Sequence, residues 1–136
     1  MRNFRRSFLR TGVLVLASAM LLAVPIVSRA DFLPHLKLNS SFPASDTTLT
    51  TAPDAVRLWF SEPADLPTSR VTVHAADGTA LKTAAPTREA AANAPLVVSF
   101  VSPPGNGSYK VTWKAMSRDG HVVDGSFNFT VRLVHQ

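Results

Sequence analysis

Hydrophobic and polar residues alternate in several short runs after residue 30, and this period of two is typical of half-buried β-strands. Asp77-Gly78 favours a tight hairpin turn, and the proline- and glycine-rich stretch 103–107 favours a loop. No run outside the first 30 residues keeps the helical period. The sequence therefore predicts an all-β domain of two packed sheets, with strands over 36–38, 56–60, 71–75, 96–101, 109–115 and 127–133.

The first 30 residues differ from the rest and resemble a cleavable signal peptide. A basic stretch to Arg10 precedes an apolar run over 11–27, and Ser28-Arg29-Ala30 offers small residues at the cleavage positions. We therefore expect a signal peptide at 1–30 and one domain at 31–136, a length normal for an immunoglobulin-like sandwich. An uncleaved N-terminal anchor is the alternative, because the apolar run approaches the length that spans a bilayer.

The basic part of this leader resembles the twin-arginine export motif. Arg5-Arg6-Ser7-Phe8-Leu9-Arg10 pairs two arginines ahead of Phe-Leu, and Arg29 adds a positive charge near the cleavage point. The resemblance implies export of a folded domain, with the general secretory route as the alternative. With either route we expect the mature protein to work outside the bacterial cytoplasm, in the periplasm.

Charge and composition exclude several function classes. Five of the 14 basic residues lie in the leader, so the remaining nine balance the nine acidic residues and are spread along the chain. The pI near 10.5 thus belongs to the leader, and we expect no nucleic-acid binding. There is no cysteine, which excludes disulfides and thiolate ligands. No nucleophile elbow, catalytic triad or phosphate-binding loop is present, so we expect a protein that is not an enzyme.

Histidine is the residue type that remains for metal chemistry, and His121 is the most informative. It follows Asp119 by two positions, so both side chains leave the same face of an extended segment. A carboxylate and an imidazole so placed form a two-point chelate for Cu(II), Ni(II) or Zn(II). The alternative is a turn in which Asp119 bonds backbone amides and His121 packs on the rim. His74 and His135 are expected to be solvated.

Three separated pieces of the chain resemble the periplasmic copper-binding CopC family in that family's order. The first opens on His35 and runs through Ser41-Phe42-Pro43-Ala44. The second contains Ala52-Pro53 and ends at Phe60-Ser61-Glu62-Pro63. The third runs from Gly107 through Ser117-Arg118-Asp119-Gly120-His121 to Val131.

This resemblance implies a cupredoxin- or immunoglobulin-like β-sandwich that binds copper as Cu(II). Its implied metal ligands are His35, Asp119 and His121, with Glu62 as a nearby supporting carboxylate. Family members also use the free amine of their N-terminal histidine. Here four residues separate Ala30 from His35, so a mature chain beginning at Asp31 lacks that amine and weaker Cu(II) binding is expected.

The implied function is a periplasmic copper-binding protein, a Cu(II) carrier or buffer in copper resistance or copper import. Met116 is the only methionine after the leader and is expected to pack rather than to hold Cu(I), which prefers clusters of sulfur ligands. An inner-membrane copper transporter of the CopD type is the expected partner, and the protein is expected to be a monomer. The alternatives are an interaction module that binds copper poorly and an oxidative copper enzyme, which needs an N-terminal histidine.

Overall fold

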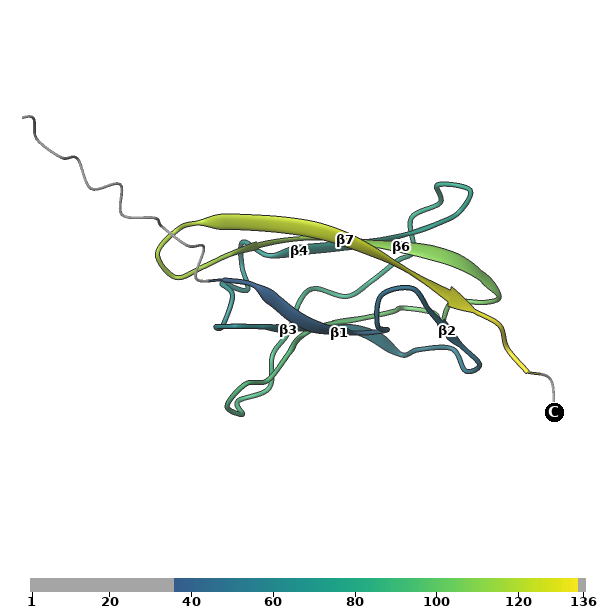
Figure 1. Cartoon of the computed structure of the whole chain (residues 1–136), viewed down its shortest axis with the longest axis horizontal. Helices are drawn as coiled ribbons and strands as arrows, with labels where there is room; N and C mark the ends of the chain where they lie inside the picture. Colours follow the sequence, from purple (N-terminus) through teal and green to yellow (C-terminus); the bar gives the residue numbers. More distant parts are fainter. Residues whose placement is uncertain (1–35, 135–136) are drawn as a thin grey trace, which may run out of the picture. The chain divides into compact units, whose positions relative to one another are not determined.

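Residues 36–134 are described by the computed structural model, and they form two packed β-sheets without a helix (Figure 1). The three-stranded sheet has the order β1-β3-β5, and the four-stranded sheet the order β2-β7-β6-β4. The prediction of an all-β sandwich is confirmed. No helix in this part of the chain could cross a bilayer. The strands are β1 (Leu38–Phe42), β2 (Thr47–Leu49), β3 (Ala55–Phe60), β4 (Arg70–Ala75), β5 (Leu96–Ser99), β6 (Gly107–Met116) and β7 (Val122–Val131).

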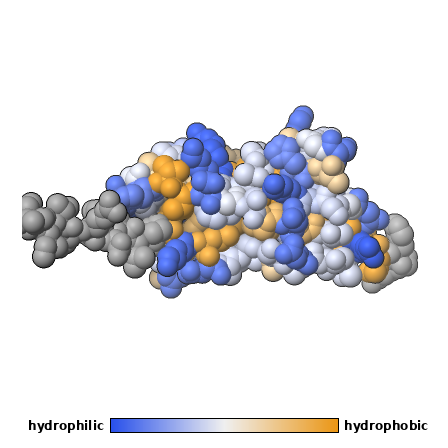
Figure 2. Space-filling view, turned by 45° about the horizontal axis from the view of Figure 1, so that its top comes forward, coloured by the Kyte–Doolittle hydropathy of each residue, from blue (hydrophilic) through white to orange (hydrophobic). Residues whose placement is uncertain are grey.

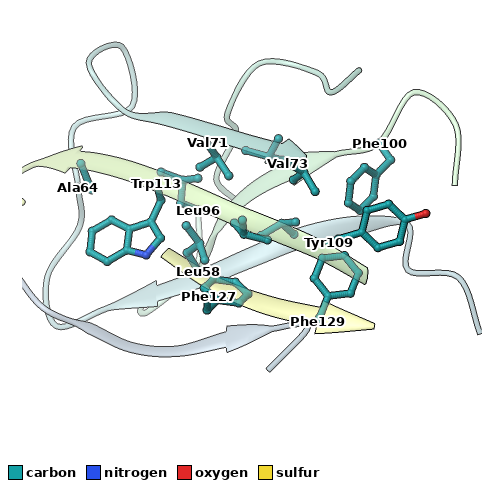
Figure 3. Packing of buried hydrophobic residues seen from close by; sticks show 14 of the residues in the cluster. Leu58, Ala64, Val71, Val73, Leu96, Phe100, Tyr109, Trp113, Phe127 and Phe129 are labelled. Carbon is teal, nitrogen blue, oxygen red and sulfur yellow. The ribbon is translucent and has the colours of Figure 1, made fainter. Parts of the chain in front are cut away.

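The alternation seen in the sequence places one apolar face of each sheet inside the sandwich. In β6, Tyr109 and every second residue after it are buried, while the residues between them are exposed. Leu58 of β3 and Leu96 of β5 face this layer from the other sheet. The rings of Tyr109 and Phe129 stack with their centroids 5.2 Å apart, at one end of the core (Figure 3).

Several predicted strand limits differ from the structure. The strand expected at 36–38 lies at Leu38–Phe42, although Leu36 is buried in the core. The strand expected from Phe127 begins five residues earlier, at Val122, because its first half pairs with β6 while its side chains remain largely exposed. The short strand β2 was not predicted; it pairs parallel to β7. The alanine-rich stretch 84–95, left open between a helical turn and a crossover, contains no helix.

Trp113 fills the core at the opposite end from Tyr109 (Figure 3). Its indole meets the ring of Phe60 edge-on, with the centroids 5.3 Å apart. The indole also lies against Gly125, the register partner of Trp113 on β7. A Cβ atom at Gly125 would lie 2.7 Å from the indole, so only glycine fits here without movement of the ring.

Candidate metal centre

A tight turn joins the two long strands β6 and β7 and carries the predicted Asp119 and His121. Met116 and Val122 form the last register pair before it. The backbone N–H of Ser117 donates to the carbonyl of His121 at 2.9 Å, and the N–H of Gly120 donates to the carbonyl of Ser117 at 3.0 Å. Gly120 has a φ of +89°, a left-handed conformation that glycine adopts at little cost. The turn is therefore closed by backbone hydrogen bonds at the end of two paired ten-residue strands.

The side chains of Asp119 and His121 meet across this turn. His121 Nδ1 lies 2.9 Å from Asp119 Oδ2, and about half of each side chain is exposed to solvent. The expectation of an extended segment was wrong: the residues occupy a turn, and the curvature of the chain brings them together. The alternative of a turn in which Asp119 bonds backbone amides is partly correct. The backbone N–H of His121 donates to Asp119 Oδ1 at 3.4 Å. A carboxylate and an imidazole thus converge at an accessible tip.

Ser117 orients this carboxylate and was not predicted from the sequence. Its side chain is buried, and its hydroxyl donates to Asp119 Oδ1. Hydrogen bonds from Ser117 and His121 hold the pKa of Asp119 at about 2, well below its ordinary value. The carboxylate is therefore ionised at any physiological pH. Serine and aspartate are both favoured in turns, but that preference alone does not indicate a contact between their side chains.

The loop after β3 carries Glu62 and connects the first strand with the β6–β7 turn. The backbone N–H of Ser61 donates to the carbonyl of Lys37 at 2.8 Å, and the N–H of Lys37 donates to Ser61 Oγ at 2.9 Å. A few residues later, the N–H of Asp65 donates to the carbonyl of Met116 at 2.8 Å. These three contacts bring the start of the described chain, the Glu62 loop and the metal-binding candidates to one end of the sandwich.

Glu62 itself is half-buried and lines a small cavity of about 70 Å³ beside Arg88. The guanidinium of Arg88 donates through Nη2 to the carbonyl of Ala64 at 2.8 Å and so ties the 84–95 stretch to the Glu62 loop. Its Nε is buried and has no partner among residues 36–134. Arg88 is a second residue near the candidate site that the sequence did not single out.

The structure brings together only part of the predicted ligand set. Within residues 36–134, no three histidine, aspartate or glutamate side chains gather closely enough to hold a metal ion, so Glu62 does not join Asp119 and His121. His35 and His135 lie outside the described residues. His74 is on β4, opposite Lys110 and four positions along the strand from the pair nearest the turn. Met116 alternates with buried residues and lies on the outer face of its sheet rather than in the core.

Comparisons with known proteins agree with this fold and with the resemblance found in the sequence. A family model described as the CopC domain matches residues 38–132. Copper resistance protein C from Escherichia coli is 31% identical over 104 residues, which cover 72% of this chain and 82% of that protein. Copper resistance protein C from Xanthomonas campestris pv. juglandis is 30% identical over 132 residues, covering 93% of this chain and 97% of that protein.

A solved structure is similar as well. The crystal structure of PcoC, a methionine-rich copper resistance protein from Escherichia coli, superimposes with a TM-score of 0.64 at 27% sequence identity. The match covers 72% of this chain and 99% of that chain, so the sandwich accounts for nearly all of PcoC.

Proposed function

This chain belongs to the CopC family of copper resistance proteins, and from that premise we propose that it binds Cu(II) in the periplasm as a carrier or buffer. The observation that carries the proposal is the contact between Asp119 and His121 on the β6–β7 turn. Copper is the cargo of such a protein rather than a catalytic cofactor. The role proposed is binding without catalysis.

The spacing of the two donor atoms suits a Cu(II) ion. Two ligands at right angles, each about 2.0 Å from a metal, are separated by about 2.8 Å. His121 Nδ1 and Asp119 Oδ2 are 2.9 Å apart, which is close to the separation of two neighbouring donors in a tetragonal site. Metal binding needs an ionised carboxylate, and Asp119 meets this requirement because its pKa is about 2. The separation of the two donor atoms is therefore compatible with one edge of a tetragonal Cu(II) site.

We propose His35 as the third donor. Lys37, two residues later, pairs with Ser61 at the same end of the sandwich, which supports this assignment. With cleavage after Ala30, His35 contributes an imidazole but no terminal amine, so affinity should be lower than at a site with an N-terminal histidine. Glu62 follows Ser61 and has a supporting role, through charge or a hydrogen bond to a ligand rather than direct coordination. A membrane copper transporter of the CopD type is the proposed partner of the monomer.

Titration of the mature protein with Cu(II) tests this function and separates it from an interaction module. We expect one equivalent of Cu(II) to produce a d–d absorption band and to quench tryptophan fluorescence, because Trp113 lies in the core at this end of the sandwich. Nitrogen and oxygen donors favour Cu(II) over Ni(II) and Zn(II) in the usual stability order. Displacement of Cu(II) by an equal concentration of Zn(II) would contradict the assignment, and absence of the band would favour the interaction module.

Export of the protein should depend on the paired arginines of the leader. Replacement of both Arg5 and Arg6 by lysine is expected to block twin-arginine export, because that pathway reads the arginine pair itself. Immunoblots of periplasmic and cytoplasmic fractions measure the effect, and mass spectrometry of the periplasmic protein reports whether it begins at Asp31. An unchanged periplasmic level in the double variant would show that the general secretory route suffices.

A further inference from the structure

A groove of about 460 Å³ separates β1 from β7, which lie in different layers of the sandwich (Figure 1). Trp113, Gly125 and Phe127 line one side of it, and Leu38 of β1 lines the other. The remaining lining residues of the described chain are serines, an asparagine and an alanine, so none is charged. Figure 2 shows hydrophobic surface between hydrophilic bands toward the end of the molecule that carries the β6–β7 turn. The groove therefore suits an uncharged and partly apolar occupant.

Both strands beside this groove have an unpaired edge within residues 36–134. β1 is the outermost strand of its sheet. β7 pairs with β2 only from Phe129 to Val131, so the stretch 122–127 has a strand partner on the β6 side alone. An unpaired edge presents a row of backbone donors and acceptors, which natural proteins usually cover. An extended segment lying in the groove would provide this cover.

Gly125 leaves a gap in the row of side chains along the β7 edge. It is the register partner of Trp113, whose indole lies against it. An aromatic residue on an adjoining strand can cover a glycine of this kind. The occupant should therefore present an aromatic side chain opposite Gly125.

The chain itself carries such a segment directly before Leu36. Cleavage after Ala30 would leave Asp31-Phe32-Leu33-Pro34-His35 ahead of it, and these five residues lie outside the described part of the chain. In an extended conformation they span about 17 Å, against about 20 Å for the six unpaired residues of β7. Phe32 supplies the aromatic ring, and Pro34 is a residue favoured in turns.

The direction of β1 lets this segment turn back beside β7. Lys37 pairs with Ser61 at the end of the sandwich that carries the β6–β7 turn, whereas the N–H of Asp46, beyond β1, donates to the carbonyl of Asn128 at 2.7 Å. β1 therefore runs in the same direction as β7. A segment that reverses just before Leu36 would run antiparallel to β7.

We propose that residues 31–35 fold back into the groove as a short strand, antiparallel to β7, with Phe32 opposite Gly125. In this register His35 lies opposite Val122, the first residue of β7, and so beside the metal-binding turn. The proposal rests on cleavage after Ala30 and extends the proposed function, because it gives His35 a fixed place.

A second copy of the chain fits this edge less well. Two β7 strands paired about the middle of the stretch 122–127 would bring Asp124 close to its own copy, and like charges on neighbouring strands are destabilising. Such a pairing would also leave Gly125 without an aromatic neighbour, because no residue of that stretch except Phe127 is aromatic.

A spin label on the segment tests its position directly. The chain contains no cysteine, so a single introduced thiol carries the label at a chosen residue. In the copper-free mature protein, a nitroxide on Asp31→Cys should broaden the NMR signals of amides around Ser126, which the register sets opposite residue 31. A nitroxide on Val134→Cys, eight residues further along the chain from Ser126, should leave those signals sharp. Broadening spread evenly over the protein from the label at residue 31 would overturn the proposal.

Hydrogen exchange at the β7 edge provides a second measurement without a label. Phe32→Ser should speed exchange of the β7 amides over 122–127 that do not face β6 by about tenfold, because the apolar contact that holds the segment is lost. Leu33→Ser is the matched control, since successive side chains of a strand point to opposite faces, and it should change exchange by less than about threefold. Circular dichroism checks that both variants are folded.

Two further results would overturn the proposal. One is an equal effect of Phe32→Ser and Leu33→Ser on exchange. The other is a dimer mass by light scattering with exchange that Phe32→Ser leaves unchanged, which would assign the edge to a second copy. Neither measurement uses copper, so failure of this proposal is distinguishable from failure of the metal site.

Discussion

Replacement of His121 by alanine is expected to abolish specific Cu(II) binding. The substitution removes one of the two donors that the β6–β7 turn holds in place, and leaves Asp119 with its hydrogen bond from Ser117. Removal of a residue that hydrogen-bonds to a metal ligand typically lowers the metal affinity 10- to 100-fold. Loss of a ligand itself should therefore weaken binding by more than about 100-fold, measured by the d–d band and by competition with a chelator of known affinity.

The other proposed site residues should follow in a definite order. Asp119→Asn should weaken binding strongly, because it removes an anionic donor whose low pKa keeps it charged. His35→Ala should weaken binding but leave a detectable two-donor site on the turn. Glu62→Gln should lower the Cu(II) affinity least, because Glu62 is not clustered with Asp119 and His121 in the described chain.

His74→Ala is the matched control for this series, since it removes a histidine from β4, away from the turn. It should bind Cu(II) as tightly as the unaltered protein. The assignment fails if His121→Ala retains full affinity, or if His74→Ala is the more damaging of the two.

Gly125→Ala is expected to destabilise the domain by about 3 kcal/mol, at the upper end for overpacking of a tight core. The added methyl would lie 2.7 Å and 2.9 Å from two atoms of the Trp113 indole. The ring cannot move freely, because it also packs edge-on against Phe60 in the core. Urea denaturation followed by tryptophan fluorescence gives the free energy of unfolding.

Gly105→Ala provides the control for this prediction, because nothing lies within 4 Å of a Cβ atom there. Its free energy of unfolding should change by less than about 0.5 kcal/mol, as for ordinary surface substitutions. Trp113→Leu should make the Gly125→Ala effect smaller, since the two residues are in contact and their effects should not add. A loss at Gly125 no larger than that at Gly105 would show that the indole does not rest on this glycine.

The sequence predicts the fold best where one face of a strand is fully buried. The long alternation of β6 was recognised from Tyr109 to Ala115 because each inward residue is apolar. The first half of β7 was missed because Asp124-Gly125-Ser126 carries no apolar pattern, and its pairing follows from the continuing ladder with β6. Strand β2 has three residues, and its parallel pairing with β7 depends on a contact distant in sequence.

At the site, the sequence identified the partners but not their geometry. The contact of Asp119 with His121 was predicted, yet from an extended segment rather than from the turn that produces it. The role of Ser117 could not be predicted, because its hydroxyl reaches Asp119 only once the turn has formed. The hydrogen bond from Arg88 to Ala64 joins residues 24 positions apart, so it forms only in the folded domain and has no local sequence signal.

Pulsed electron paramagnetic resonance on the Cu(II)-loaded mature protein tests the central claim most directly, because it counts the imidazoles bound to the copper. The account predicts nitrogen modulation from two imidazoles, altered by ¹⁵N-histidine labelling, and reduced to the signal of one at most for any copper that His121→Ala retains. A spectrum of the unaltered protein without imidazole modulation, or one that His121→Ala leaves unchanged, would contradict a Cu(II) site built on the Asp119–His121 pair.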